Sequence, residues 1–158
     1  MTRIRQAYGQ GRPLPGYLLA IGGYAALVGA VAAAGRLTGV RLPRRFSFGD
    51  TVLISVATHK ASRLLTKEAV TSPLRAPFTR YEAPAGHAEL KESPREDDPA
   101  RHAIGELLTC PFCAGVWIAS GLTAGLVFAP RLTRLVSTAL TAVAASDALN
   151  LVYDKLKS

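Results

Sequence analysis

Two long apolar segments without a formal charge stand out along the chain, one of 23 residues over 13–35 and one of 24 residues over 107–130. A helix needs about 20 predominantly apolar residues to cross the hydrocarbon core of a bilayer. A third apolar segment, near the C-terminus, is interrupted only by Asp147. The pattern therefore predicts an integral membrane protein with transmembrane helices over 17–35, 104–130 and 135–153.

The segment over 46–65 is ambiguous, because its apolar centre is short and charged residues lie at both ends. Asp50 lies near its start, where it could cap a helix. His59, Lys60 and Arg63 lie near its end, from which long cationic side chains can reach the membrane interface. We favour a short second transmembrane helix, with an amphipathic helix in the interface as the alternative.

Residues 1–16 are polar and basic and lead directly into the first apolar segment. A cleaved signal peptide is the alternative interpretation, because the three alanines at 32–34 resemble a cleavage site. The apolar segment is long for a signal peptide, and basic residues follow it at once: Arg36, Arg41, Arg44 and Arg45. Since basic residues resist translocation, we expect 17–35 to remain as the first transmembrane helix.

Residues 66–103 are hydrophilic and contain five of the ten prolines. The acidic part over 82–98 is typical of a flexible loop. Asp98 followed by Pro99 predicts the start of a short helix that leads into the membrane. The expected fold class is therefore all-α, an integral membrane bundle of three or four transmembrane helices with a cytoplasmic proline-rich loop.

The net charge of +8 and the pI near 10 suggest nucleic-acid binding, but the distribution of the charges argues against it. Residues 1–45 carry seven basic and no acidic side chains, whereas residues 60–106 carry eight of each sign. No basic stripe with interleaved aromatic residues is visible, so we expect no nucleic-acid partner.

The positions of lysine and arginine predict the orientation, because these residues favour the cytoplasmic side of short loops. With four transmembrane helices and the N-terminus inside, thirteen basic residues lie in the cytoplasm and six outside. With three helices and the N-terminus outside, the count is fourteen against five. Both arrangements place residues 66–103 and the C-terminus in the cytoplasm.

The sharpest motif is Cys110-Pro111-Phe112-Cys113. Residues three apart share a helix face, and Thr109 is suited to cap the helix that follows. Cys110 would then lie at the positive helix end, which lowers the pKa of a thiol, as in redox-active pairs. The motif resembles the Cys-Pro-aromatic-Cys of glutaredoxins, but no alternating strand–helix pattern surrounds it. Alternatively, both thiols pack between helices as small hydrophobic groups.

Cys110 and Cys113 are also the candidate metal ligands. His102 and Glu106 share their helical face, but a straight helix separates His102 from Cys113 by about 16 Å. Zinc ligands must converge within about 2.3 Å of the ion, so one helix cannot supply all four. A site would need ligands from other segments: His59 or Asp147. No particular cofactor follows from this pattern.

Asp147 is a candidate functional residue, because an ionisable side chain within a transmembrane segment is costly. It lies at a depth similar to those of the two cysteines and of His59, which is a further candidate for a binding role. The alternative is that Asp147 pairs with Lys60 or Arg63 and holds the bundle together.

Arg75 and Arg80 are candidate binding residues within the hydrophilic segment. The prolines around them favour extended backbone, and a guanidinium group there could bind a lipid phosphate or the carboxylate of a partner. We slightly prefer the alternative, a stiff connector that covers the inner mouth of the bundle.

Two stretches, RLLTKEAVTSPLRAPFTR over 63–80 and GELLTCPFCAGVWIA over 105–119, resemble the hallmark segments of a bacterial membrane-protein family catalogued as a domain of unknown function. The resemblance spans about 46–153. Members of that family occur in spore-forming and actinomycete bacteria, and one is described as a sporulation protein. The resemblance implies a multi-pass protein of the bacterial cell membrane, and it supplies no activity, catalytic residue or cofactor.

We expect a non-enzymatic membrane component that acts through protein or lipid contacts, because small-residue helix faces and a charged loop favour association. The alternative is a membrane thiol oxidoreductase, exchanging electrons with a quinone or a cytoplasmic partner, or a metal-binding protein, in either case through Cys110 and Cys113. A small transporter built around Asp147 ranks third. The expected partners are the lipid bilayer, a membrane or cytoplasmic protein, and a second copy of the chain.

Overall fold

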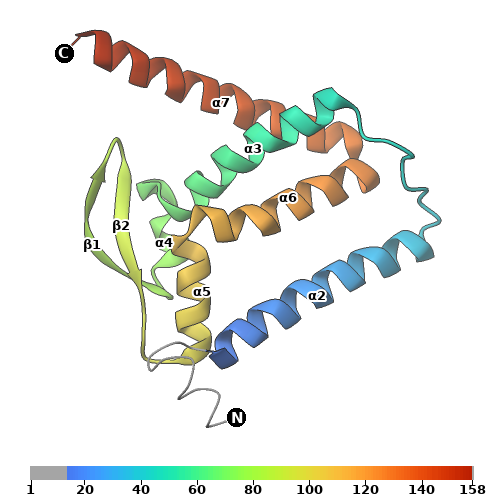
Figure 1. The fold of residues 1–158 in the computed structure, drawn as a ribbon, viewed down its shortest axis with the longest axis horizontal. Helices are drawn as coiled ribbons and strands as arrows, with labels where there is room; N and C mark the ends of the chain where they lie inside the picture. Colours follow the sequence, from blue (N-terminus) through green and yellow to red (C-terminus); the bar gives the residue numbers. More distant parts are fainter. Residues whose placement is uncertain (1–13, 158) are drawn as a thin grey trace.

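Four long helices dominate the computed structural model, which describes residues 14–157 (Figure 1). They are α2 (Leu14–Leu37), α3 (Phe48–Thr66), α6 (Pro111–Phe128) and α7 (Pro130–Lys157). Within the described part, α2, α6 and α7 are long and apolar enough to cross a membrane. Most of the basic N-terminal segment predicted over 1–16 lies outside the described residues.

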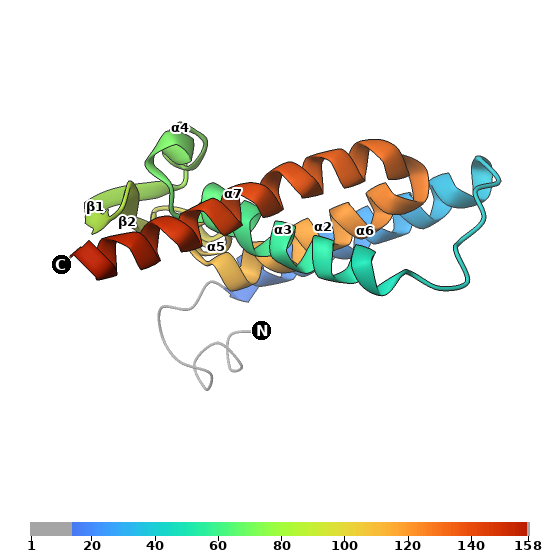
Figure 2. The same ribbon diagram turned by 90° about the horizontal axis from the view of Figure 1, so that it is seen from above.

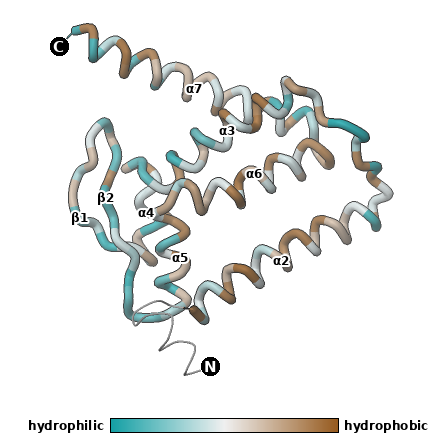
Figure 3. The backbone as a smooth tube through the Cα atoms, viewed as in Figure 1, coloured by the Kyte–Doolittle hydropathy of each residue, from teal (hydrophilic) through white to brown (hydrophobic). Residues whose placement is uncertain are grey.

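The ambiguous segment forms α3, which packs along both α6 and α7 (Figures 1 and 2). Thr141 of α7 donates a hydrogen bond from its hydroxyl to the carbonyl oxygen of Leu53 at 3.3 Å. On the other side, a Cβ atom added to Gly115 of α6 would lie 3.8 Å from the Thr58 methyl carbon. α3 is therefore the central helix of the bundle, although it is more polar than α2 and α6 (Figure 3).

α2 lies at the edge of the bundle, where it contacts mainly the short helix α5 (Pro99–Thr109). The ring of Tyr24 meets that of Trp117 edge to face at 5.2 Å, and the hydroxyls of Tyr24 and Ser120 are 2.7 Å apart. One face of α2 carries the small residues Gly22 and Gly29. This face is open, because no atom lies within 4 Å of a Cβ added to either glycine. This face is therefore available to lipid or to another helix.

The segment that follows α3 is not the flexible loop that we expected, and because it contains two β-strands the fold is not all-α. It folds into short elements: a 3-10 helix η1 (Ala69–Thr71), α4 (Ser72–Arg75), β1 (Thr79–Gly86) and β2 (Glu89–Pro94). The strands form an antiparallel hairpin, with Arg80 opposite Ser93. Its turn uses the left-handed backbone region, at φ of 86° for Gly86 and 65° for Ala88, which glycine adopts without strain. We call residues 67–98 the polar cap.

The helix predicted over 104–130 is in fact two helices, α5 and α6, which meet at Cys110. The backbone of Cys110 is extended, with φ −110° and ψ 106°. The cause is Pro111, whose ring disfavours helical backbone in the residue before it. The Asp98–Pro99 helix start is confirmed, because the Asp98 carboxylate accepts hydrogen bonds from the amides of Ala100 and Arg101 at 2.9 Å each.

The two ends of the bundle differ in structure. At one end lie the polar cap, α5 and the C-terminus of α7, and both α5 and the hairpin run across the bundle axis (Figure 1). At the other end lie the linker over 38–47 and the tight turn between α6 and α7. We call these the capped end and the linker end. The hydropathy colouring shows hydrophilic residues gathered at the hairpin and along the linker (Figure 3).

Candidate functional site

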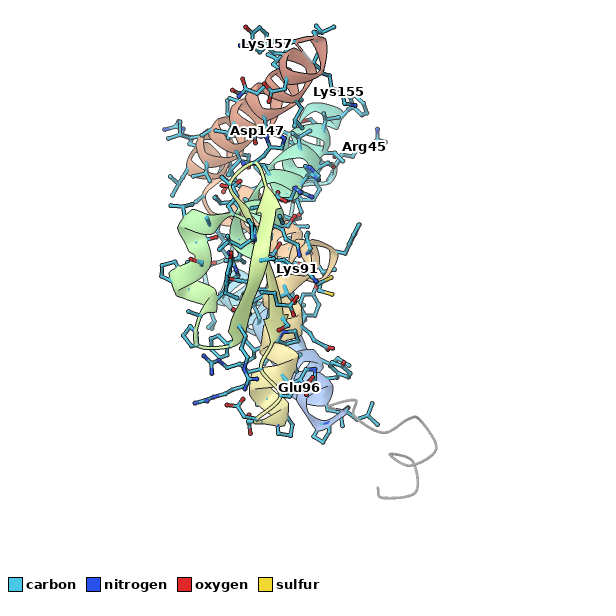
Figure 4. All side chains as sticks on the ribbon, turned by 90° about the vertical axis from the view of Figure 1, so that its left-hand side faces the viewer. Arg45, Lys91, Glu96, Asp147, Lys155 and Lys157 are labelled. Carbon is cyan, nitrogen blue, oxygen red and sulfur yellow. The ribbon has the colours of Figure 1, made fainter. Side chains whose placement is uncertain are left out.

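Lys60, near the end of α3, joins the bundle to the polar cap. Its ammonium nitrogen Nζ lies 2.8 Å from Oδ2 of Asp147 on α7, and it also forms an ion pair with Glu68, just before η1. The Lys60 side chain is only 11% exposed, whereas that of Asp147 is 49% exposed. The pairing interpretation of Asp147 is therefore confirmed, with Lys60 rather than Arg63 as its partner. Figure 4 looks onto the capped end, with Asp147 labelled on α7.

Arg63, one turn further along α3, binds the hairpin. Its guanidinium contacts both carboxylate oxygens of Glu89, the first residue of β2, at 2.5 and 2.7 Å, and adds a third hydrogen bond at 3.1 Å. Such two-pronged pairs are stronger and more directional than a single charged hydrogen bond. Backbone bonds reinforce the contact, because the amide of Leu90 donates to the Lys67 carbonyl at 2.8 Å.

Arg75 is the most deeply buried charged residue described, with no exposed side-chain surface. Its Nε donates to Glu92 of β2 at 2.5 Å. Its Nη1 donates to the carbonyl of Leu65 at 2.9 Å, to that of Glu68 at 3.1 Å and to the Thr71 hydroxyl at 2.7 Å. The Leu65 carbonyl lies in the last turn of α3, where helix carbonyls lack partners within the helix. Arg75 therefore stabilises the C-terminal end of α3 and fixes the cap to it.

The two candidate binding arginines have different environments. Arg75 is inaccessible to a lipid or a partner protein, and the carboxylate that it binds is Glu92 of the same chain. Arg75 is thus engaged within the chain, and the binding role that the sequence suggested for it stays a prediction. Arg80 is exposed and lines a surface hollow on the cap.

The cysteine pair lies at the elbow between α5 and α6. Cys110, not Thr109 as expected, caps α6, because its Sγ accepts a hydrogen bond from the Cys113 amide at 3.3 Å. Both cysteines are free thiols, and their sulfur atoms are 2.8 Å apart. Cys113 is exposed and Cys110 is half-buried. The structure therefore brings the two thiols together at a position that a partner can reach.

The other candidate metal ligands do not form a cluster with the two thiols. Glu106 on α5 interacts with Tyr17 of α2 and lies 3.4 Å from Nε2 of His102. Between residues 14 and 157, no group of three or more histidine, cysteine or acidic side chains could hold a metal ion. His59 is exposed, and neither it nor Asp147 joins the cysteines in such a group.

The acidic partners in the cap were missed by reasoning from the sequence alone. Glu68, Glu89 and Glu92 lie in or beside a stretch whose acidic residues suggested a solvated loop. One available signal was the charge balance, since residues 60–106 carry eight basic and eight acidic side chains. An exact balance within a hydrophilic segment beside apolar helices is compatible with internal pairing, and the described residues of this segment form five such pairs.

Comparisons with known proteins agree with the resemblance noted in the sequence. The chain is 29% identical over 91 residues to the UPF0713 protein YngL of Bacillus subtilis. The aligned residues make up 56% of this chain and 65% of that protein. It is 33% identical over 81 residues to the sporulation protein YjcA of the same organism, covering 45% of this chain and 62% of the relative. The matches thus span less than two thirds of either relative. No solved structure matches.

A family model described as "Protein of unknown function (DUF1360)" matches residues 53–153. The match begins within α3 and ends near the C-terminus of α7, so it includes the polar cap and both cysteines. α2 lies outside it. Because the match covers well over half of the sequence, the chain belongs to the DUF1360 family.

Proposed function

We propose that this chain is a non-enzymatic membrane component, a four-helix bundle that holds the polar cap at the cytoplasmic surface for contacts with protein or lipid. The observation that carries the proposal is the position of Lys60, which binds Asp147 of the bundle and Glu68 of the cap at the same time. An element attached in this way keeps a fixed position relative to the membrane. A fixed polar surface at headgroup level suits recognition rather than chemistry on an enclosed substrate.

The four-helix arrangement is supported by the length and placement of α3. Its 19 residues span about 28 Å at 1.5 Å per residue, close to the hydrocarbon thickness of a bilayer. Because α3 packs against both α6 and α7, its polar side chains can face protein instead of lipid. This placement explains why α3 is less apolar than a helix surrounded by lipid.

The cytoplasmic orientation of the cap is supported by the charge count. With α3 crossing the membrane, the capped end carries ten lysine and arginine residues among residues 14–157, and the linker end carries six. Such a difference favours the capped end inside. The same orientation places the C-terminus of α7 in the cytoplasm.

The proposal is tested by photo-crosslinking in cells. A photoreactive residue replaces Tyr81, which is 62% exposed on the cap, or Leu42, which is 79% exposed in the linker, as the matched control. We expect discrete protein or lipid adducts from position 81 and fewer from position 42. The adducts should persist when Cys110→Ser and Cys113→Ser are combined. Equal adducts from both positions would contradict a specific contact role for the cap, and their loss in the double serine variant would contradict a role that is independent of the thiols.

A second candidate function is thiol–disulfide exchange, which the 2.8 Å separation of the two sulfur atoms favours. In that reaction the Cys110 and Cys113 thiols would form a disulfide and reduce the disulfide of a partner protein to two thiols, so that two electrons and two protons are transferred. The test is the mass of the purified chain after incubation with a disulfide-bonded peptide and thiol alkylation. A disulfide in wild type, with a trapped mixed disulfide in Cys113→Ser, would favour this function.

A further inference from the structure

A hollow of about 560 Å³ lies on the polar cap, between α4 and the hairpin. Two arginines line it, Arg80 at the start of β1 and Arg95 just after β2. Ser72 and Tyr81 contribute to the same lining. The hollow therefore combines cationic groups, a hydroxyl and an exposed aromatic ring.

The hollow carries an excess of positive charge. Its one acidic lining residue is Glu92, and the buried guanidinium of Arg75 already neutralises that carboxylate at 2.5 Å. Neither Arg80 nor Arg95 forms an ion pair with any residue between 14 and 157. Two acidic residues close in sequence are engaged elsewhere, Glu82 with Lys91 and Asp97 with Arg101. No carboxylate between residues 14 and 157 therefore neutralises the charge of Arg80 or Arg95 by a direct ion pair.

Two guanidinium nitrogens around this site are buried without an acceptor. Nε of Arg95, which lines the hollow, and Nη2 of Arg75, behind Glu92, are both enclosed and have no hydrogen-bond partner in the described structure. The Arg95 side chain makes only a long hydrogen bond within the described structure, from Nη2 to the Ala76 carbonyl at 3.4 Å. Buried donors without acceptors are uncommon in proteins and point to a missing partner.

We propose that the hollow binds a phosphate group through Arg80 and Arg95. Guanidinium groups suit the planar, two-pronged recognition of phosphate oxygens, and the Ser72 hydroxyl can add a further hydrogen bond. Tyr81, which lines the hollow, is 62% exposed, and tyrosine is enriched at headgroup level. The function proposed above places the cap at the membrane surface. On that basis, the phosphate is that of an anionic phospholipid.

The test compares lipid and free phosphate as sources of the same group. The full chain, purified in a neutral detergent, is titrated with phosphatidylglycerol, with phosphatidylcholine or with inorganic phosphate, and bound species are counted by native mass spectrometry. The variants are Arg80→Gln and Arg95→Gln. The matched control is Arg131→Gln, the same change at an exposed arginine of the linker end. Circular dichroism verifies that all variants keep their helices.

We expect phosphatidylglycerol to bind in preference to phosphatidylcholine, with about fivefold weaker binding for each cap variant and no change for Arg131→Gln. Binding of inorganic phosphate alone, with the same dependence on Arg80 and Arg95, supports the site and assigns it to a soluble phosphate. Binding of neither probe, or equal losses in Arg131→Gln, overturns the site. These titrations in detergent do not depend on orientation, so a cap found outside the cell would contradict the proposed function without affecting them.

Discussion

The capped end and the linker end of the bundle use charged residues in opposite ways. At the capped end Arg75 is completely buried and the Glu92 side chain is 5% exposed. At the linker end the ion pair between Asp50 and Arg134 has distances of 2.8 and 3.0 Å, but the Arg134 side chain is 52% exposed and that of Asp50 is 14% exposed. Similar contacts therefore lie in different environments.

This difference in burial determines how much the structure depends on each charged residue. An exposed pair contributes little, because water solvates each charge almost as well as its partner does. A buried pair gives little net stability when complete, yet it makes the loss of one partner severe, since the other charge remains in a poorly solvated site. The capped end should thus depend on each of its partners, and the linker end should tolerate their loss.

The largest effect is expected for Arg75→Met. The change leaves the Glu92 carboxylate buried without its partner and removes the hydrogen bond to the Leu65 carbonyl. We expect a loss of about 3–5 kcal/mol in the free energy of unfolding, measured by circular dichroism in detergent. Trypsin should also cut faster at Arg80 and Lys91 if the hairpin separates from α3.

Two further variants control this prediction. Arg134→Met removes a half-exposed arginine from the linker end and should cost less stability than Arg75→Met, because water reaches this pair. Combining Arg75→Met with Glu92→Met removes both buried charges and should recover much of the loss. If the double variant is as unstable as Arg75→Met, the pair is not the source of the stability.

A smaller effect is expected for Lys60→Met, because Asp147 is half-exposed and water can solvate it when the lysine is absent. The more enclosed Glu68 carboxylate would lose its partner, and we expect a loss of about 2 kcal/mol. Asp147→Asn, which keeps the shape of that side chain, should cost less than Lys60→Met in the same melting experiment. A larger loss for Asp147→Asn than for Lys60→Met would show that Asp147 contributes more than Glu68 to the stability of the Lys60 contacts.

The packing of α5 against the hairpin provides a third comparison. A Cβ added to Gly105 would lie 2.6 Å from the carbonyl oxygen of Phe78 and 2.8 Å from the Pro94 Cβ. Because backbone cannot move aside easily, Gly105→Ala should cost about 1–3 kcal/mol. Gly121→Ala is the matched control, since nothing lies within 4 Å of its added Cβ. Equal melting temperatures for the two variants would contradict this packing.

The smallest effect concerns an exposed pair within the cap. The hydrogen bond from Lys91 is the main cause that lowers the pKa of Glu82. Since the folded pKa is depressed, the pair stabilises above the ordinary carboxyl pKa and loses this effect as the pH falls through the folded value. Lys91→Gln should raise the pKa of Glu82 with no measurable change in melting. Carboxyl-carbon NMR titration would measure the shift, and an unchanged pKa would contradict the contact.

The helices were largely predictable from sequence, and the cap was not. Long apolar segments identify α2, α6 and α7, because length and hydropathy are enough to indicate a candidate membrane span. α3 remained ambiguous, since helices covered by protein can carry polar residues such as Lys60. The break at Cys110 was recoverable from Pro111, which restricts the residue before it.

The candidate site was predicted only in part. The pairing of Asp147 with Lys60 follows from the cost of a charge in a membrane helix, so it could be named in advance. The burial of Arg75 could not, because it depends on Glu92 reaching it from a hairpin 17 residues further along the chain. An acidic, proline-rich stretch is typical of a loop, and only long-range pairing reveals its fold.

The most direct test of the account determines on which side of the membrane the two ends lie. In a chain with Cys110→Ala and Cys113→Ala, a single cysteine is introduced as Leu42→Cys in the linker or His87→Cys at the hairpin tip, both exposed positions. Intact cells are treated with a membrane-impermeant maleimide. We predict labelling of Leu42→Cys in intact cells and of His87→Cys only after permeabilisation. Labelling of both positions under the same condition would show that α3 does not cross the membrane and would contradict the four-helix arrangement.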